Sequence, residues 1–264
     1  MMRSVLTKTL YDRQWFILGW AIAFMALTAL LASFFPAMKL SGLEELVKNM
    51  PPAFTGLIGD LGLLSALDTY MASQLFDIRL PLISGIMAII LGLGLSSNEE
   101  EAGELRTTLA LPVSRTKVLL HKWLAIVSIA FVMVLAIAAG IFVVQPFIDG
   151  AALTLAEVAP LLGVSWLLMV AFGTIPFAAD MVSGRREVAM AAGVIVVIGS
   201  FILTTFGQAV EWLADFEKLS LLYYFPANDI MRNGVHWPDA AVLGSITAGL
   251  LLLSLAVFRK RDVH

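Results

Sequence analysis

The sequence predicts an all-α membrane protein with six transmembrane helices, organised as one domain over residues 1–264. Hydrophobic residues make up 59% of the 264 residues and charged residues only 14%, whereas ordinary soluble domains are about 25% charged. The mean hydropathy is +0.90. Helices are favoured because backbone groups inside a bilayer must bond within their own segment, and the alternating pattern of barrel strands is absent.

Six segments without Asp, Glu, Lys or Arg reach or approach the 20 or so residues that a spanning helix needs. They are Gln14–Met38, Leu80–Asn98, Trp123–Ile148, Val158–Ala179, Val188–Val210 and Ala240–Phe258. An even number of spans places both termini on one side. The loops on that side hold most of the 17 lysines and arginines, so we expect it to face the cytoplasm. The first apolar run is too long for a signal peptide and is interpreted as an anchor.

Three further segments are expected to be helices that do not span. Arg3–Arg13 has an apolar face and a basic face, which is typical of an amphipathic elbow helix on the cytoplasmic leaflet. Ser41 begins a capping-box helix that Pro51 ends. Ala209–Leu219 carries an apolar stripe. The latter two are expected to be re-entrant or surface helices that cover the outer mouth.

The segment Glu99–Arg115 is the longest densely charged stretch in this apolar chain. Leu105 and Leu109 fall on one helical face, and Pro112 ends that helix. Ser114 is then a good N-cap for a helix that continues into the third span. The pattern predicts a short cytoplasmic helix joined directly to a membrane span.

This segment, ahead of the third of six spans, resembles the ABC-2 type transporter permease family. In that family it reads acidic-x-Gly-Thr-Leu-Glu-x-Leu-Leu-x-x-Pro-Val-Ser-Arg. Glu104 and Arg106 depart from the pattern, standing where Thr and Glu are usual. The matching residues are Glu100, Glu101, Gly103, Leu105, Leu109, Pro112, Val113, Ser114, Arg115 and Lys122.

The resemblance implies a permease subunit of an ABC exporter in a bacterial or archaeal plasma membrane (the cell inner membrane), moving a lipophilic or amphiphilic drug, peptide or lipid. Two permease chains, identical or related, would join two ABC-type ATPase subunits, which bind ATP and Mg, so this chain would be no enzyme and need no cofactor. Spans one, two and five would form the dimer face and pathway. The residues expected to couple to the ATPase are Glu100, Glu101, Gly103, Leu105, Leu109, Pro112 and Arg115.

Other sites are not predicted. A P-loop motif does not occur, so ATP is not expected to bind this chain through one. His121, His236 and His264 lack the spacing of metal ligands. The absence of cysteine excludes disulfides and thiolate metal sites, and a net charge of −3 gives no reason to expect a nucleic-acid partner.

The charged residues near the spans are expected at the ends of the spans. Asp77 and Arg79 are expected to anchor at headgroups before the second span. Asp180 is expected to end the fourth span in a local ion pair with Arg185 or Arg186. Gly92 predicts close helix packing. No acidic residue is expected deep in a span, which disfavours a proton-coupled pump.

Two other classes of function stay open. One is a channel or secondary carrier working without ATP, which should show buried ionisable groups or inverted repeats. The other is a membrane scaffold or sensor that binds a partner without transport. The Glu99–Glu101 run also has a simpler interpretation, a solvated loop.

Overall fold

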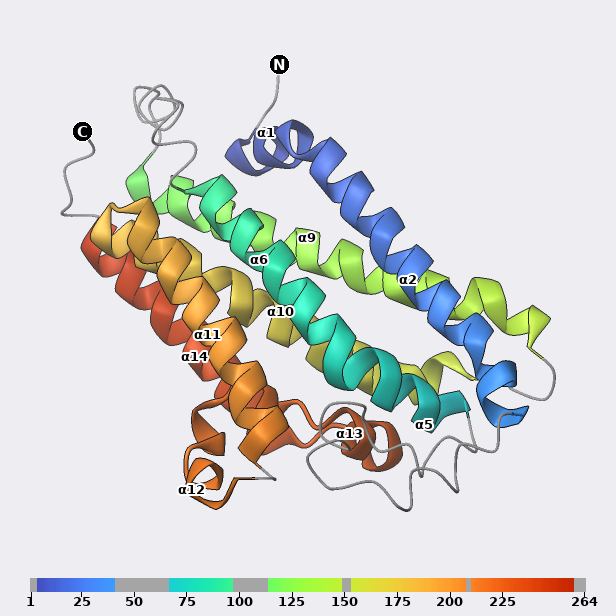
Figure 1. The fold of residues 1–264 in the computed structure, drawn as a ribbon. Helices are drawn as coiled ribbons and strands as arrows, with labels where there is room; N and C mark the ends of the chain where they lie inside the picture. Colours follow the sequence, from blue (N-terminus) through green and yellow to red (C-terminus); the bar gives the residue numbers. More distant parts are fainter. Residues whose placement is uncertain (1–3, 41–66, 97–113, 149–152, 208–209, 259–264) are drawn as a thin grey trace.

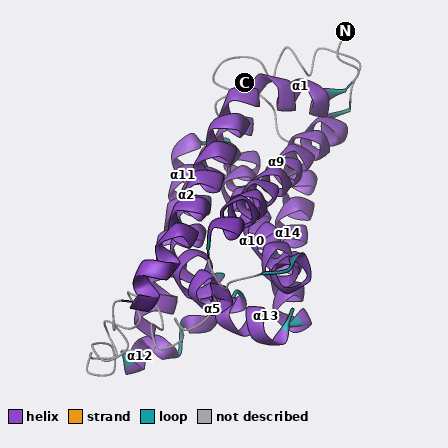
Figure 2. Ribbon diagram, turned by 90° about the vertical axis from the view of Figure 1, so that its right-hand side faces the viewer, coloured by secondary structure: helices purple, strands orange, loops and turns teal. Residues whose placement is uncertain are grey.

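The computed structural model describes residues 4–40, 67–96, 114–148, 153–207 and 210–258. Within these ranges the chain is helical, joined by turns, with no strand (Figure 2). Six helices are long and apolar enough to cross a membrane, as the sequence predicts. They cover Gln14–Pro36, Leu67–Leu95, Arg115–Phe147, Leu155–Ser183, Arg186–Gly207 and Trp237–Phe258.

The long helices form a bundle with short helices at both ends (Figure 1). In chain order the elements are α1 (Val5–Asp12), α2 (Gln14–Leu40), α5 (Leu67–Met71), the π-helix η2 (Ala72–Arg79), α6 (Leu80–Leu95), α9 (Arg115–Val144), the 3-10 turn η3 (Gln145–Phe147), α10 (Leu155–Ser183), α11 (Arg186–Gly207), α12 (Glu211–Ala214), the 3-10 turns η4 (Glu217–Leu219) and η5 (Leu222–Tyr224), α13 (Ala227–Asn233) and α14 (Trp237–Phe258).

Helix α10 is the centre of the bundle, because it packs against α6, α9, α11 and α14. Helix α2 lies at the edge, where its main neighbour is α9 (Figure 1). The apolar window of α10 is 67% buried within the chain, against 17% for that of α2. The outer surface of α2 is nevertheless apolar, which suits contact with lipid or another membrane chain.

The two ends of the bundle differ in what they carry. Helix α1, the end of α6, the start of α9, the turn between α10 and α11 and the end of α14 lie at one end, here called the terminal face (Figure 1). Helices α5, α12 and α13 lie at the other end, here called the opposite face. This arrangement agrees with an even number of spans.

Helix α1 is shorter than the predicted Arg3–Arg13. Ser4 caps it by accepting a hydrogen bond from the Thr7 backbone N–H at 3.1 Å. Its apolar residues Val5 and Leu6 pack against the core, and the helix contacts α9. The amphipathic pattern therefore directs α1 onto the bundle at the terminal face.

The second span starts well before the predicted Leu80. Helices α5, η2 and α6 run without a break from Leu67 to Leu95, so Asp77 and Arg79 lie inside the span. The sequence placed both residues before the spanning helix, and that boundary is wrong. The expectations that they anchor at headgroups and that no acidic residue lies deep in a span depend on where the bilayer lies along this helix, and they stay predictions. The early turns tolerate polar residues because their side chains bond the helix backbone, as Ser73 Oγ does to Thr69 O at 2.9 Å.

The predicted helix Ala209–Leu219 is broken into α12 and η4. The chain then turns back onto α11, where Ser220 Oγ donates to Ser200 O at 2.9 Å and lies 2.7 Å from Thr204 Oγ1. The Leu221 backbone N–H also donates to Ser200 Oγ at 3.1 Å. These tertiary hydrogen bonds hold a short turn against α11, which helical periodicity does not reveal. The predicted helix beginning at Ser41 lies outside the described residues.

Gly140 sets the close crossing of α9 with α2, because a Cβ there would lie 2.6 Å from Met25 O and 2.8 Å from Thr28 Cβ. We expect Gly140→Ala to destabilise the protein by about 1–3 kcal/mol, the usual cost of overpacking. Thermal unfolding in detergent measures this. Gly163→Ala on α10 is the matched control, since its Cβ would meet nothing within 4 Å. Equal stability of the two variants would contradict the close contact of α9 with α2 at Gly140.

Candidate functional site

The predicted coupling residues fall almost entirely in one stretch. Arg115 is described, at the first turn of α9, where it is half-buried. The remaining ones, Glu100, Glu101, Gly103, Leu105, Leu109 and Pro112, lie in 97–113, outside the described residues. What the structure does show is how the chain enters and leaves this stretch at the terminal face.

The chain re-enters the bundle at the cap that the sequence predicted. Ser114 has an extended backbone, and its side chain accepts a hydrogen bond from the Lys117 backbone N–H at 3.3 Å. Helix α9 then continues for 30 residues, to Val144. The helix that begins at Arg115 and the third span are therefore one continuous helix.

The chain leaves the bundle at the last turn of α6, where carbonyl groups lack helical partners. Lys122 Nζ, from α9, donates to Leu95 O at 2.9 Å. Arg13 Nη2, from the junction of α1 and α2, donates to Gly94 O. Ser96 Oγ satisfies a third carbonyl, Gly92 O, at 2.8 Å. We call the contacts of Arg13 and Lys122 the α6 cap.

The α6 cap is favourable for two reasons. Positive charges near a helix C-terminus interact well with the helix dipole, and hydrogen bonds to charged groups each contribute about 1.5–3 kcal/mol. Lys122 is only 2% exposed, so water competes little for its ammonium group. Gly94 leaves room for the guanidinium, because a Cβ there would lie 2.8 Å from Arg13 Nη1.

Helix α10 is joined to this cluster by close contacts. Trp123 Nε1 of α9 donates to Thr174 Oγ1 at 3.0 Å. A Cβ on Gly92 would lie 2.9 Å from Gly173 O, so α6 and α10 touch backbone to backbone. The close packing predicted from Gly92 is confirmed. Asp180 is buried near the end of α10, and its local ion pair with Arg185 or Arg186 stays a prediction.

Sequence reasoning did not assign the α6 cap. In the sequence analysis, Arg13 and Lys122 counted only among the positive charges expected on the cytoplasmic side, and Lys122 also matched the family pattern. The signal that could have found them is the pairing of small residues, Gly92 and Gly94, with cations flanking the neighbouring spans. Partners 81 and 27 residues away cannot be chosen from spacing alone.

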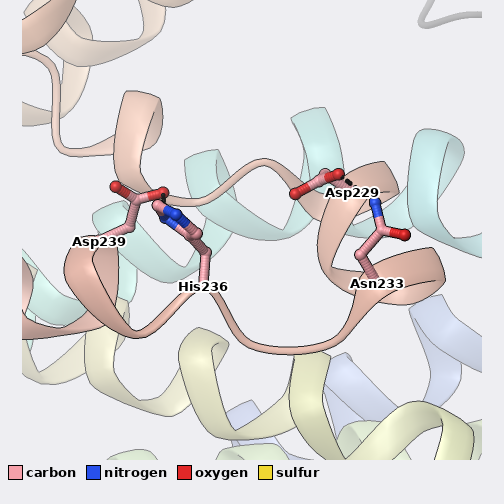
Figure 3. Close-up of polar contacts among 4 residues, drawn as sticks. All are labelled: Asp229, Asn233, His236 and Asp239. Atoms are coloured by element: carbon pink, nitrogen blue, oxygen red, sulfur yellow. Dashed lines mark hydrogen bonds and ion pairs between the residues drawn. The ribbon is translucent and has the colours of Figure 1, made fainter.

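Two polar contacts at the opposite face are local. His236 Nδ1 lies 2.8 Å from Asp239 Oδ2 at the start of α14, and Asn233 Nδ2 donates to Asp229 Oδ1 at 2.6 Å on α13 (Figure 3). Each pair joins neighbours on one helix end, so both stabilise local structure. Across the described parts of the chain, no group of three or more His, Cys, Asp or Glu residues could hold a metal ion.

The architecture defines a multi-pass helical membrane protein. The family of ABC-2 transporter proteins matches residues 13–263 of the sequence. The chain therefore belongs to the ABC-2 family of transporter proteins, and it is a permease of the ABC transporter class, whose members generally pair with ABC ATPase subunits. No curated protein matches the chain.

Replacing Lys122 with Met keeps the apolar stem and removes the donor to Leu95 O. We expect the amide hydrogens of the last turn of α6 to exchange at least tenfold faster, as the loss of a hydrogen bond from a charged group implies. Hydrogen–deuterium exchange with mass spectrometry measures this. Lys117→Met removes an exposed lysine from the same helix and should leave the exchange unchanged. Equal exchange in both variants would show that the α6 cap is not a stabilising contact.

Proposed function

We propose that this chain is the membrane subunit of an ABC exporter and works with ATP hydrolysed by separate ATPase subunits. The observation that carries the proposal is the anchoring of residues 97–113 at both ends: the α6 cap holds the start, and the first turn of α9 holds the end. A partner that binds this segment would act on two spans at once. Family membership supports the same role.

The coupling residues are the ones that match the family pattern. In this proposal Glu100, Glu101, Leu105 and Leu109 dock on the ATPase, and Pro112 with Arg115 passes the force into α9. Arg13 and Lys122 are positioning residues, because they join α6 to the elbow and to the third span. The chain itself binds neither ATP nor Mg.

The transporter contains two permease chains, as a homodimer or with a related chain. Spans one, two and five form the surface between them. The support is that spans one and five have apolar outer surfaces, where Leu30 and Ile198 are 56% and 47% exposed. An apolar surface on a span suits contact with another membrane chain.

The cargo is lipophilic or amphiphilic and moves outward across a bacterial or archaeal plasma membrane. The exposed side chains along α2 and α11 support this, since large apolar residues such as Leu18, Ile22 and Ile195 dominate them. A strongly polar cargo would need a hydrophilic path, because burying unpaired polar groups is costly.

One observation favours a second candidate, a carrier that works without ATP. Asp77 lies inside the second span, and an ionisable residue within a span is a candidate for proton or ion coupling. This candidate predicts transport by the chain alone, with no ATPase bound.

Purification of the tagged chain from its native membrane separates these candidates. We expect an ATPase subunit to co-purify, and the double variant Glu101→Lys with Leu105→Asp to lose at least 90% of it, because about 3 kcal/mol of contact energy changes occupancy that much. Quantitative mass spectrometry of the eluate measures the ratio of the two chains.

The matched control is Asp215→Lys with Leu219→Asp. It makes the same kinds of change at exposed residues of the opposite face and should leave the ATPase bound. If no ATPase accompanies the parent chain, or if the first double variant retains it fully, the proposed function is wrong.

A further inference from the structure

The entry to the second span is built from an unusual helix. In η2 the Leu80 N–H bonds Leu75 O, five residues back, and this π-helical geometry covers Ala72–Arg79. Helices of this type are rare and occur frequently at functional sites. This one places Arg79 inside the candidate span Leu67–Leu95. Charged side chains within spans are energetically costly and rare, and those that occur usually mark functional sites.

Arg79 is fixed by neutral partners. Its Nη1 donates to Gln74 O and, at 2.9 Å, to Gln74 Oε1. Of the acidic residues that the structure describes, none forms an ion pair with it, including Asp77 two residues away and Asp229 on α13, which packs against η2. The guanidinium is therefore oriented but keeps its full positive charge and its remaining donors.

An apolar stripe begins at Arg79. The residue has α-helical dihedral angles and leads directly into α6. Ile83, Ile86 and Ile90 follow at intervals of four, three and four residues, which puts them on the same helix face as Arg79. Arg79 and Ile83 are half-buried, and Ile86 and Ile90 are exposed.

We propose that Arg79 and the stripe Ile83–Ile86–Ile90 bind an amphiphile with an anionic headgroup and a single long apolar tail. Arginine suits phosphate and carboxylate because its planar fork gives two parallel hydrogen bonds, and the stripe extends far enough for a tail of about ten carbons, at 1.5 Å per residue. The inference rests on the proposed function in one respect, because it assigns a negative charge to the amphiphilic cargo proposed above. A cationic amphiphile would meet the guanidinium and be repelled.

The test uses the full chain in dodecyl maltoside, whose headgroup is uncharged. Dodecyl phosphate and dodecanoate are the anionic probes, and dodecyltrimethylammonium is the cationic probe with the same tail. Native mass spectrometry counts bound probe. We expect Arg79→Gln to weaken binding of the anionic probes roughly tenfold or more, and Arg79→Lys to weaken it less. Arg232→Gln, at an exposed arginine of α13, should change nothing.

A second pair of substitutions tests binding of the apolar tail. Ile86→Ser with Ile90→Ser should reduce binding of dodecyl phosphate several-fold while inorganic phosphate binds as before. The comparison of dodecyl phosphate with dodecanoate tells which anion the site prefers. An unfolding temperature equal to the parent's shows that a variant is folded. If Arg79→Gln does not fold, the comparison of the parent with Arg79→Lys still tests the role of the guanidinium.

Equal binding of dodecyl phosphate to the parent and to Arg79→Gln would overturn the inference, as would tighter binding of the cationic probe to the parent. These measurements need no ATPase, so their failure leaves the co-purification result standing. Conversely, if the chain binds the anionic probes but no ATPase co-purifies with it, the amphiphile site is supported and the proposed exporter function is wrong.

Discussion

Two positively charged side chains on the last carbonyl groups of α6 hold the terminal face together. Lys122 reaches Leu95 O from the third span, and Arg13 reaches Gly94 O from the elbow. Because these groups satisfy backbone acceptors that the helix leaves without partners, their removal costs more than two surface charges would. Trp123 then joins α9 to α10 through Thr174. Spans one, two, three and four are thus tied to one another beside the segment that we propose as the docking site.

The two faces of the bundle are built differently, and the difference fits a transporter driven from one side. At the terminal face, charged donors and close backbone contacts limit how far one span can move alone. At the opposite face, the contacts of the turn against α11 are neutral hydrogen bonds among Ser200, Thr204 and Ser220. Neutral bonds are individually weaker than charge-assisted ones. A displacement at the terminal face would be shared among the spans that these contacts tie together.

The sequence predicts the features that depend on local physics. Run length and flanking charge place all six spans, and the Ser114 cap follows from residue type and position. It misses what tertiary contacts decide. Asp77 and Arg79 look like the end of a span because charge normally marks one, yet η2 carries both into it. The break after Ala214 depends on hydrogen bonds between Ser220 and α11. Of the predicted site, Arg115 is placed, and the residues in 97–113 stay predictions.

In the proposed function, the α6 cap passes movement of the ATPase to the spans. The chain has no cysteine, so spin labels can be attached at Phe34→Cys on α2 and Ile202→Cys on α11, two exposed positions. Pulsed electron resonance, with one labelled chain in each transporter, then gives their distance without nucleotide and with a non-hydrolysable ATP analogue. The account predicts a shift on nucleotide binding that disappears in Arg13→Gln with Lys122→Met while the ATPase stays bound. The same shift in both proteins would contradict it.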